Sequence, residues 1–225
     1  MKERIIQLFE DTLFRNSIYL MFATAVMAGF GFFFWLTTAR LFSTENIGLA
    51  TTLISVMSLV ATFSLIGFDA AFVRFLPGAE DKNRKINTGL ILVGVTAFVL
   101  STIFVLSIHY ISPRLSFVQD HPLYGIAFII ACILNALNVL TDSIFLANRQ
   151  AKYTLIINTI FSMCKMVLPF AFVPWGAIGI FSAAAGAQAI GFLLSIAVLI
   201  WKFEYIPKFT VDRYVVSGVW KYSAA

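Results

Sequence analysis

The chain has 225 residues, of which 60% are hydrophobic and only 12% are charged, and its mean hydropathy is +0.90. A soluble domain carries about twice that share of charged residues, so the composition excludes a soluble enzyme and indicates an integral membrane protein. The net charge of +5 would suggest a nucleic-acid partner in a soluble protein. In a membrane protein the excess of Lys and Arg in cytoplasmic loops explains it more simply, and we predict no nucleic-acid partner.

Residues 1–16 are predicted to form a cytoplasmic amphipathic segment. Acidic and basic residues are mixed in it, which does not fit a cleavable signal peptide. Its apolar residues Ile5, Leu8, Phe9 and Leu13 fall at helical spacing. This pattern is typical of a helix that lies on the membrane surface.

Six apolar segments follow, each long enough to cross a hydrocarbon core, which needs roughly 20 helical residues. They cover residues 17–39, 47–68, 86–111, 122–147, 153–173 and 176–201. We therefore predict an all-α, polytopic membrane protein with a six-helix transmembrane lobe at 17–201. Residues 202–225 form a second cytoplasmic segment.

The distribution of basic residues predicts the orientation of the six spans. Thirteen of the sixteen Lys and Arg residues fall on the side of the N-terminus, and only Arg40 and Arg114 fall on the other, while Lys165 lies within a span. Because Lys and Arg favour the cytoplasmic side, we expect both termini in the cytoplasm. The location that follows is the cytoplasmic membrane.

The fourth and fifth spans each carry one stripe of polar side chains. The stripes consist of Asn135, Asn138 and Asp142 in the fourth span and of Asn158, Ser162 and Lys165 in the fifth. Spacings of three and four residues place each set on one helix face. Two neighbouring helices with one polar face each predict a water-accessible cavity between them, and these residues other than Asp142 are candidates for substrate binding.

Lys165 is the most informative of these residues, because a Lys at the centre of a membrane helix costs about 2.5–3.5 kcal/mol. Three interpretations are open: a cation offered to an anionic substrate, a structural pair with Asp142, or a side chain that reaches the interface by helix tilt. Asp142 is accordingly either the partner of Lys165 or an ion-coupling residue.

The sixth span has a small residue at every fourth position: Gly179, Ala183, Ala187 and Gly191. Such a pattern lets helix backbones approach closely. We interpret it as a packing seam.

No motif for catalysis or for a cofactor is present. The sequence has no Walker A motif, no H-E-x-x-H and no G-x-S-x-G. Its two Cys residues are too isolated for a disulfide framework or a zinc site. We predict that the protein is not an enzyme and holds no metal or cofactor.

Three stretches carry a family resemblance. ARLFSTENIGLATTLISVMSLVATFSLIGFDAAFVRFLP at 39–77 combines Ala39-Arg40, an acidic turn and a glycine with a later Gly-Phe and Arg-Phe-Leu-Pro. FLANRQAKYTLIINTI at 145–160 and WGAIGI at 175–180 add to it. The chain resembles the polysaccharide biosynthesis and O-antigen flippase proteins of the multidrug/oligosaccharidyl-lipid/polysaccharide exporter (MOP) superfamily.

The resemblance implies a fold and an activity. Such proteins have two six-helix lobes around a central cavity, so this chain corresponds to the N-terminal lobe, and residues 202–225 would lead to a second lobe. That lobe, or a second copy of this chain, is an implied partner beside the lipid bilayer. The implied substrate is an oligosaccharide carried on undecaprenyl diphosphate. Lys165 and Arg40 would face its anionic groups, and Arg74 would lie at the inner entrance.

Two other functions stay open. A cation-coupled drug or metabolite antiporter of the same superfamily would favour carboxylates in its cavity. A non-transporting membrane scaffold for glycan assembly would fit a chain of half the usual length.

Overall fold

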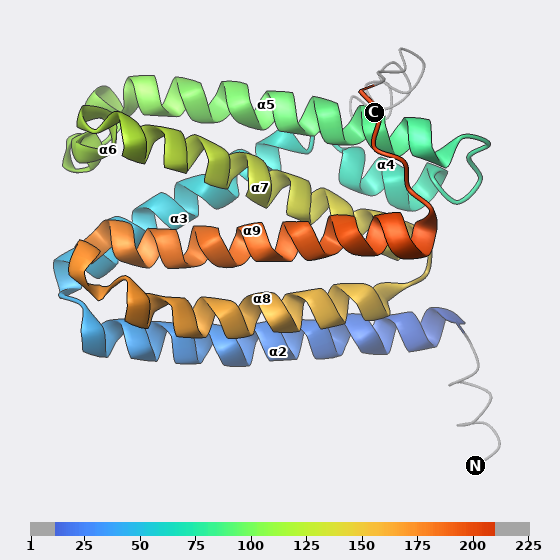
Figure 1. Cartoon of the computed structure of the whole chain (residues 1–225), viewed down its shortest axis with the longest axis horizontal. Coiled ribbons are helices and arrows are strands. Elements are labelled where there is room, and N and C mark those ends of the chain that lie inside the picture. Colours follow the sequence, from blue (N-terminus) through green and yellow to red (C-terminus); the bar gives the residue numbers. More distant parts are fainter. Residues whose placement is uncertain (1–11, 210–225) are drawn as a thin grey trace.

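The computed structural model describes residues 12–209, and every regular element in that range is a helix. Six of the helices are long and apolar enough to cross a membrane, as predicted, and they lie side by side (Figure 1). The segment 1–11 and the residues from 210 onward lie outside the described range, so the amphipathic N-terminal helix stays a prediction. The helices are α2 (Thr12–Leu41), α3 (Thr44–Ser64), α4 (Phe68–Phe75), α5 (Lys82–Ile111), α6 (Ser116–Asp120), α7 (Pro122–Ala147), α8 (Ala151–Ala171) and α9 (Gly176–Phe203), with single 3-10 turns η1 (Pro113–Leu115) and η2 (Val173–Trp175).

Several helix ends follow from local chemistry. Ser43 caps α3 by accepting a hydrogen bond from the backbone N–H of Asn46 at 3.3 Å. Asp81 caps α5 in the same way, with the N–H of Arg84 at 3.0 Å. These caps satisfy backbone donors that the first turn of a helix leaves unpaired.

The second span is shorter than the sequence predicts. α3 ends at Ser64, and Gly67 then adopts a left-handed φ of 78°, which glycine reaches at little cost. The chain turns there and forms the separate short helix α4, which buries Phe68 and Phe72 and packs against α7. The Gly-Phe pair of the family pattern thus marks a helix break.

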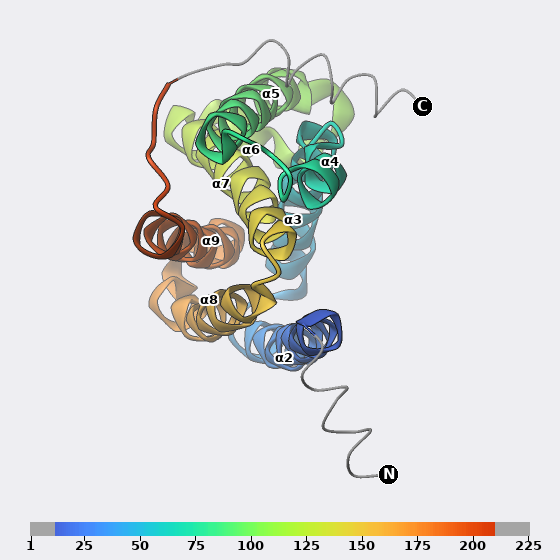
Figure 2. The same cartoon turned by 90° about the vertical axis from the view of Figure 1, so that its right-hand side faces the viewer.

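α7 is the central helix of the bundle. It packs against α3, α4, α5, α8 and α9, and the end-on view shows it surrounded by them (Figure 2). α2 lies at one edge and packs mainly along α8, although α3 follows it directly in the chain. The neighbour of α2 in sequence is therefore not its main neighbour in space.

The small residues of α9 form a packing seam, as predicted. Gly179, Ala183, Ala187 and Gly191 are all buried, and α9 packs against α8 and α7. At Gly179 the approach is closest, because a Cβ there would lie 2.1 Å from the backbone oxygen of Phe172. No side chain fits at that position without a backbone shift.

We therefore expect Gly179→Ala to lower the free energy of unfolding by about 1–3 kcal/mol, the usual cost of overpacking. The measurement is reversible unfolding in mixed micelles, monitored by circular dichroism. Gly186→Ala is the matched control on the same helix, since its Cβ would meet only the Leu168 side chain at 3.5 Å. Equal stability of the two variants would contradict this account of the seam.

Candidate functional site

The interior of the bundle holds a polar network centred on Asn135 of α7. The Gln188 amide of α9 donates to Asn135 Oδ1, and Asn135 Nδ2 donates to the backbone oxygen of Met57 in α3 at 3.4 Å. Asn135 and Gln188 are buried. The network therefore ties three helices together, and both amides are engaged in doing so.

Asn138, one turn further along α7, faces the seam of α9. Its Oδ1 lies 3.5 Å from the hydroxyl of Ser195, which donates to it. A Cβ at Gly191 would lie 3.0 Å from Asn138 Nδ2, so the glycine makes room for the amide. The Asn138 side chain thus joins α7 to α9.

Asp142 turns toward α8 instead. Asn158 Nδ2 of α8 donates to Asp142 Oδ2 at 3.4 Å. The other carboxylate oxygen, Oδ1, is buried and makes no hydrogen bond of standard geometry among the described residues. The hydroxyl of Thr154, which makes none either, interacts with the carboxyl group at longer range. A buried oxygen without a donor is costly, so this carboxyl group has capacity for one more proton, cation or water. Ser162, one turn beyond Asn158, is also buried.

Lys165 occupies a different environment from Asp142. Its ammonium nitrogen lies 4.6 Å from the ring centroid of Phe34 in α2 and 6.0 Å from that of Phe161 in its own helix. Within the described range no carboxylate forms an ion pair with it, and Asp142 is bonded to Asn158, seven residues or about 10 Å away along α8. The pair between Lys165 and Asp142 that the sequence left open is not formed.

The contact with Phe34 explains how α8 carries a cation inside a membrane. A ring face attracts an ammonium group with about 0.5–2 kcal/mol, and Phe34 is fully buried between the helices. An aromatic ring offsets part of the cost of burial but leaves the charge without a counter-ion. The ammonium therefore remains available to an anion.

The two arginines of the predicted set lie elsewhere. Arg40 is exposed in the last turn of α2, and Arg74 is exposed on α4, with its guanidinium 5.3 Å from the ring centroid of Phe75. The end of α2 and helix α4 lie at opposite ends of the bundle (Figure 1). The structure does not gather Arg40, Arg74 and Lys165 into one cluster.

The sequence interpretation missed a polar face on α3. Its exposed positions carry the hydroxyl residues Thr51, Thr52, Ser55, Ser58 and Thr62 beside the apolar Leu59 and Phe63, whereas those in the middle of α5 carry apolar residues such as Val95, Phe98, Ile103 and Leu106. Most of these hydroxyls donate to the carbonyl four residues earlier, for example Thr51 to Ile47 at 2.7 Å. Their oxygens can still accept hydrogen bonds. The spacing of Ser and Thr by three, four and seven residues was the available signal.

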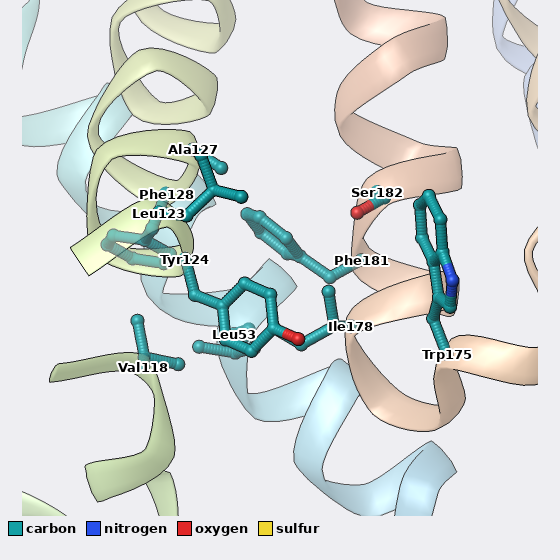
Figure 3. A pocket seen from close by; sticks show the side chains of 10 residues that line it. All are labelled: Leu53, Val118, Leu123, Tyr124, Ala127, Phe128, Trp175, Ile178, Phe181 and Ser182. Atoms are coloured by element: carbon teal, nitrogen blue, oxygen red, sulfur yellow. The ribbon is translucent and has the colours of Figure 1, made fainter. Parts of the chain in front are cut away.

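Two pockets lie near the loop-bearing ends of α3 and α7. A polar pocket of about 810 Å³ next to the start of α3 is lined by Thr44, Glu45, Thr52 and Arg114, among others. A second pocket of about 300 Å³ lies between α7 and α9 and is lined by Tyr124, Phe128, Trp175 and Phe181, among others (Figure 3). Of these two pockets, the polar one offers charged side chains to a hydrophilic ligand, whereas the polar side chains in the second are Tyr124, Trp175 and Ser182.

Comparison with known proteins assigns the fold. Residues 13–218 match the polysaccharide biosynthesis protein family. The chain belongs to this family. With six helices long and apolar enough to cross a membrane, it is a multi-pass membrane protein of this family. A search of curated proteins found no match.

A solved MOP superfamily transporter from Pyrococcus furiosus shares the fold. The TM-score is 0.74 at 16% sequence identity, over 97% of this chain and 53% of that one. The chain therefore spans about half the length of that transporter. The Pyrococcus protein is described as having a binding pocket of reverse polarity that suggests a different function. At this identity the likeness establishes the fold alone.

The network around Asn135 predicts energetic coupling between α7 and α9. In a double-mutant cycle, Asn135→Ala and Gln188→Ala should show a coupling of about 0.6–1.7 kcal/mol, the range of interhelical hydrogen bonds in membranes. Unfolding in mixed micelles gives the measurement. The control cycle joins Asn135→Ala with Ser195→Ala, which binds Asn138 instead. Additive effects in the first cycle would show that the hydrogen bond is not formed.

Proposed function

We propose that the chain is the N-terminal lobe of a flippase that moves lipid-linked oligosaccharide precursors across the cytoplasmic membrane. The observation that carries the proposal is Lys165, a cation within a span that faces an aromatic ring and, among the described residues, no carboxylate. Membership of the polysaccharide biosynthesis family supports it. In this proposal the ammonium binds the diphosphate that joins the sugar to its undecaprenyl carrier, because a charge-assisted hydrogen bond to phosphate is strong.

In this proposal the other polar groups each contact a different part of the substrate or hold the helices in place. The hydroxyl face of α3 accepts hydrogen bonds from sugar hydroxyls, and Ser162 and Asn158 extend the polar wall next to Lys165. Arg40 receives the headgroup at the outer end, and Arg74 guides it at the inner entrance. Asn135 and Asn138, whose amides join helices, fix the shape of the wall.

A second six-helix lobe, or a second copy of this chain, completes the cavity. Transporters of this kind work by rocking two halves against each other around a site near the membrane centre. The half-length match to a MOP transporter supports this arrangement.

The orientation of the lobe is part of the proposal, with both termini in the cytoplasm. Basic residues cluster at the start of α5 and between α7 and α8, with further ones at the end of α9: Lys82, Arg84, Lys85, Arg149, Lys152, Lys202 and Lys208. These helix ends lie together at one end of the bundle (Figure 1). The opposite end has only Arg40 and Arg114 among the described basic residues. This asymmetry favours a cytoplasmic position of the basic end.

Lys165→Ala tests the proposal in cells that depend on the full protein for glycan display. Export should fall about 10- to 150-fold, which corresponds to the loss of a hydrogen bond to a charged group, and Lys165→Arg should restore part of it. The measurement is the accumulation of radiolabelled lipid-linked oligosaccharide inside the cell, at equal protein level. Lys152→Ala is the control, since this exposed Lys of α8 stacks on Tyr153, away from Phe34. Normal export by Lys165→Ala would refute the role of the cation.

Asp142 supports a second proposal, that of ion coupling, because its Oδ1 is buried without a donor among the described residues. Asp142→Asn keeps the shape but removes the charge. Transport into vesicles should then no longer respond to an imposed proton or sodium gradient, whereas Asp120→Asn, an exposed carboxylate of α6, should leave the response intact. An unchanged response in Asp142→Asn would exclude this role.

The same carboxyl group keeps a cation-coupled drug antiporter as the alternative function. Deletion of the gene separates the two candidates. Accumulated lipid-linked oligosaccharide supports the flippase, and raised sensitivity to cationic drugs without such accumulation supports the antiporter.

A further inference from the structure

An apolar groove lies on the bundle between α5, α7 and the segment 204–209 that follows α9. Its volume is about 480 Å³, and its lining includes Leu90, Gly94, Phe98 and Ile133 on the helices and Lys208 on the segment. The end-on view shows this segment crossing from α9 to α5 (Figure 2). The groove is separate from Lys165 and from the polar network.

The wall of the groove is held in place by Asn87 of α5. Asn87 Nδ2 donates to the backbone oxygen of Ile206 at 3.1 Å, while Asn87 Oδ1 accepts from the hydroxyl of Tyr205 and from the N–H of Lys208 at 3.0 Å. Tyr205 is 5% exposed, and burial raises the pKa of its phenol above the usual range, so the hydroxyl stays protonated and donates. Three hydrogen bonds fix where Lys208 leaves the groove.

The dimensions of the groove match one acyl chain. It follows α5 from Asn87 to Phe98, which are eleven residues or about 16 Å apart along the helix. That length is close to half of a hydrocarbon core of about 30 Å. A helix about 10 Å across would occupy roughly 1,250 Å³ over that length. The groove therefore suits a narrower object that stays within one leaflet.

The charge at the mouth of the groove selects the headgroup. Lys208 is exposed just beyond the end of the sixth span, and its ammonium has no hydrogen-bond or ion-pair partner among residues 12–209. This position at the interface does not depend on which side is cytoplasmic. We propose that the groove binds a membrane phospholipid with an anionic headgroup, with one acyl chain along α5 and the phosphate on Lys208.

Quenching by brominated lipids tests this site in the full chain. The native Trp residues are replaced by Phe, and Phe98→Trp then places a single indole reporter in the groove, at a residue that is half exposed. At equal mole fraction, brominated phosphatidylglycerol should bind about fivefold more strongly near this reporter than brominated phosphatidylcholine, as expected for one Lys at the interface. The control reporter is Ile103→Trp, at an exposed position of α5 outside the groove, and it should show no preference.

Three further variants sharpen the result. Lys208→Gln should abolish the preference of the groove reporter, and Lys202→Gln, at an exposed Lys near the end of α9, should keep it. Gly94→Leu should fill the groove, because a Cβ there has room. It should therefore reduce quenching of the groove reporter but not of the control reporter. All variants must remain monodisperse and helical by circular dichroism.

The proposal is overturned if the preference survives Lys208→Gln, if the control reporter shows it equally strongly, or if the groove reporter shows none. It is also overturned if a polyprenyl phosphate displaces brominated phosphatidylglycerol better than unlabelled phosphatidylglycerol does, since the groove would then hold the substrate lipid. None of these outcomes changes the predicted effect of Lys165→Ala, so the two proposals fail separately.

Discussion

The structure depends on one constraint: a polar side chain buried in a membrane needs a partner on another helix, because no water is there to replace it. α7 carries three such side chains, and each selects a different neighbour. Asn135 binds α3 and α9, Asn138 binds α9, and Asp142 binds α8. These contacts fix the rotation of the central helix, and Gly191 in the α9 seam leaves room for the Asn138 amide.

The same constraint identifies the groups that packing does not explain. Around Asn135, the amides of Asn135 and Gln188 bind each other and the backbone oxygen of Met57, which explains them as structural groups. The charge of Lys165 is matched only by aromatic rings, and Asp142 Oδ1 is not matched within the described residues. A charge within a membrane span without a counter-ion lowers stability, so the half-buried Lys165 and the carboxyl group of Asp142 are candidates for a function. This argument separates Lys165 and Asp142 from the amides that surround them.

The sequence predicted the parts of the fold that depend on one helix at a time. Length and hydropathy indicated the six spans, and spacings of three and four residues indicated the polar stripes of α7 and α8. It did not predict which helices pack together. Helical spacing shows which residues share one face of a helix, but not which other helix that face contacts. Hence Lys165 contacts α2 rather than Asp142, and α2 packs on α8 rather than on α3. The break at Gly67 was hidden because Ile66 and Phe68 continue the apolar run, although only a glycine reaches its backbone angle easily.

The exposed faces of the lobe differ in a way that the membrane itself explains. Lipid tails offer no hydrogen bonds, so a helix face that meets them is favoured to be apolar, as on α5 with Val95 and Ile103. The exposed face of α3 instead carries Thr51, Ser55 and Thr62 beside Leu59 and Phe63. A face with this many hydroxyls fits water, a polar ligand or a partner better than it fits lipid. The lobe therefore has an apolar exposed side on α5 and an exposed side on α3 where hydroxyl and apolar residues are mixed.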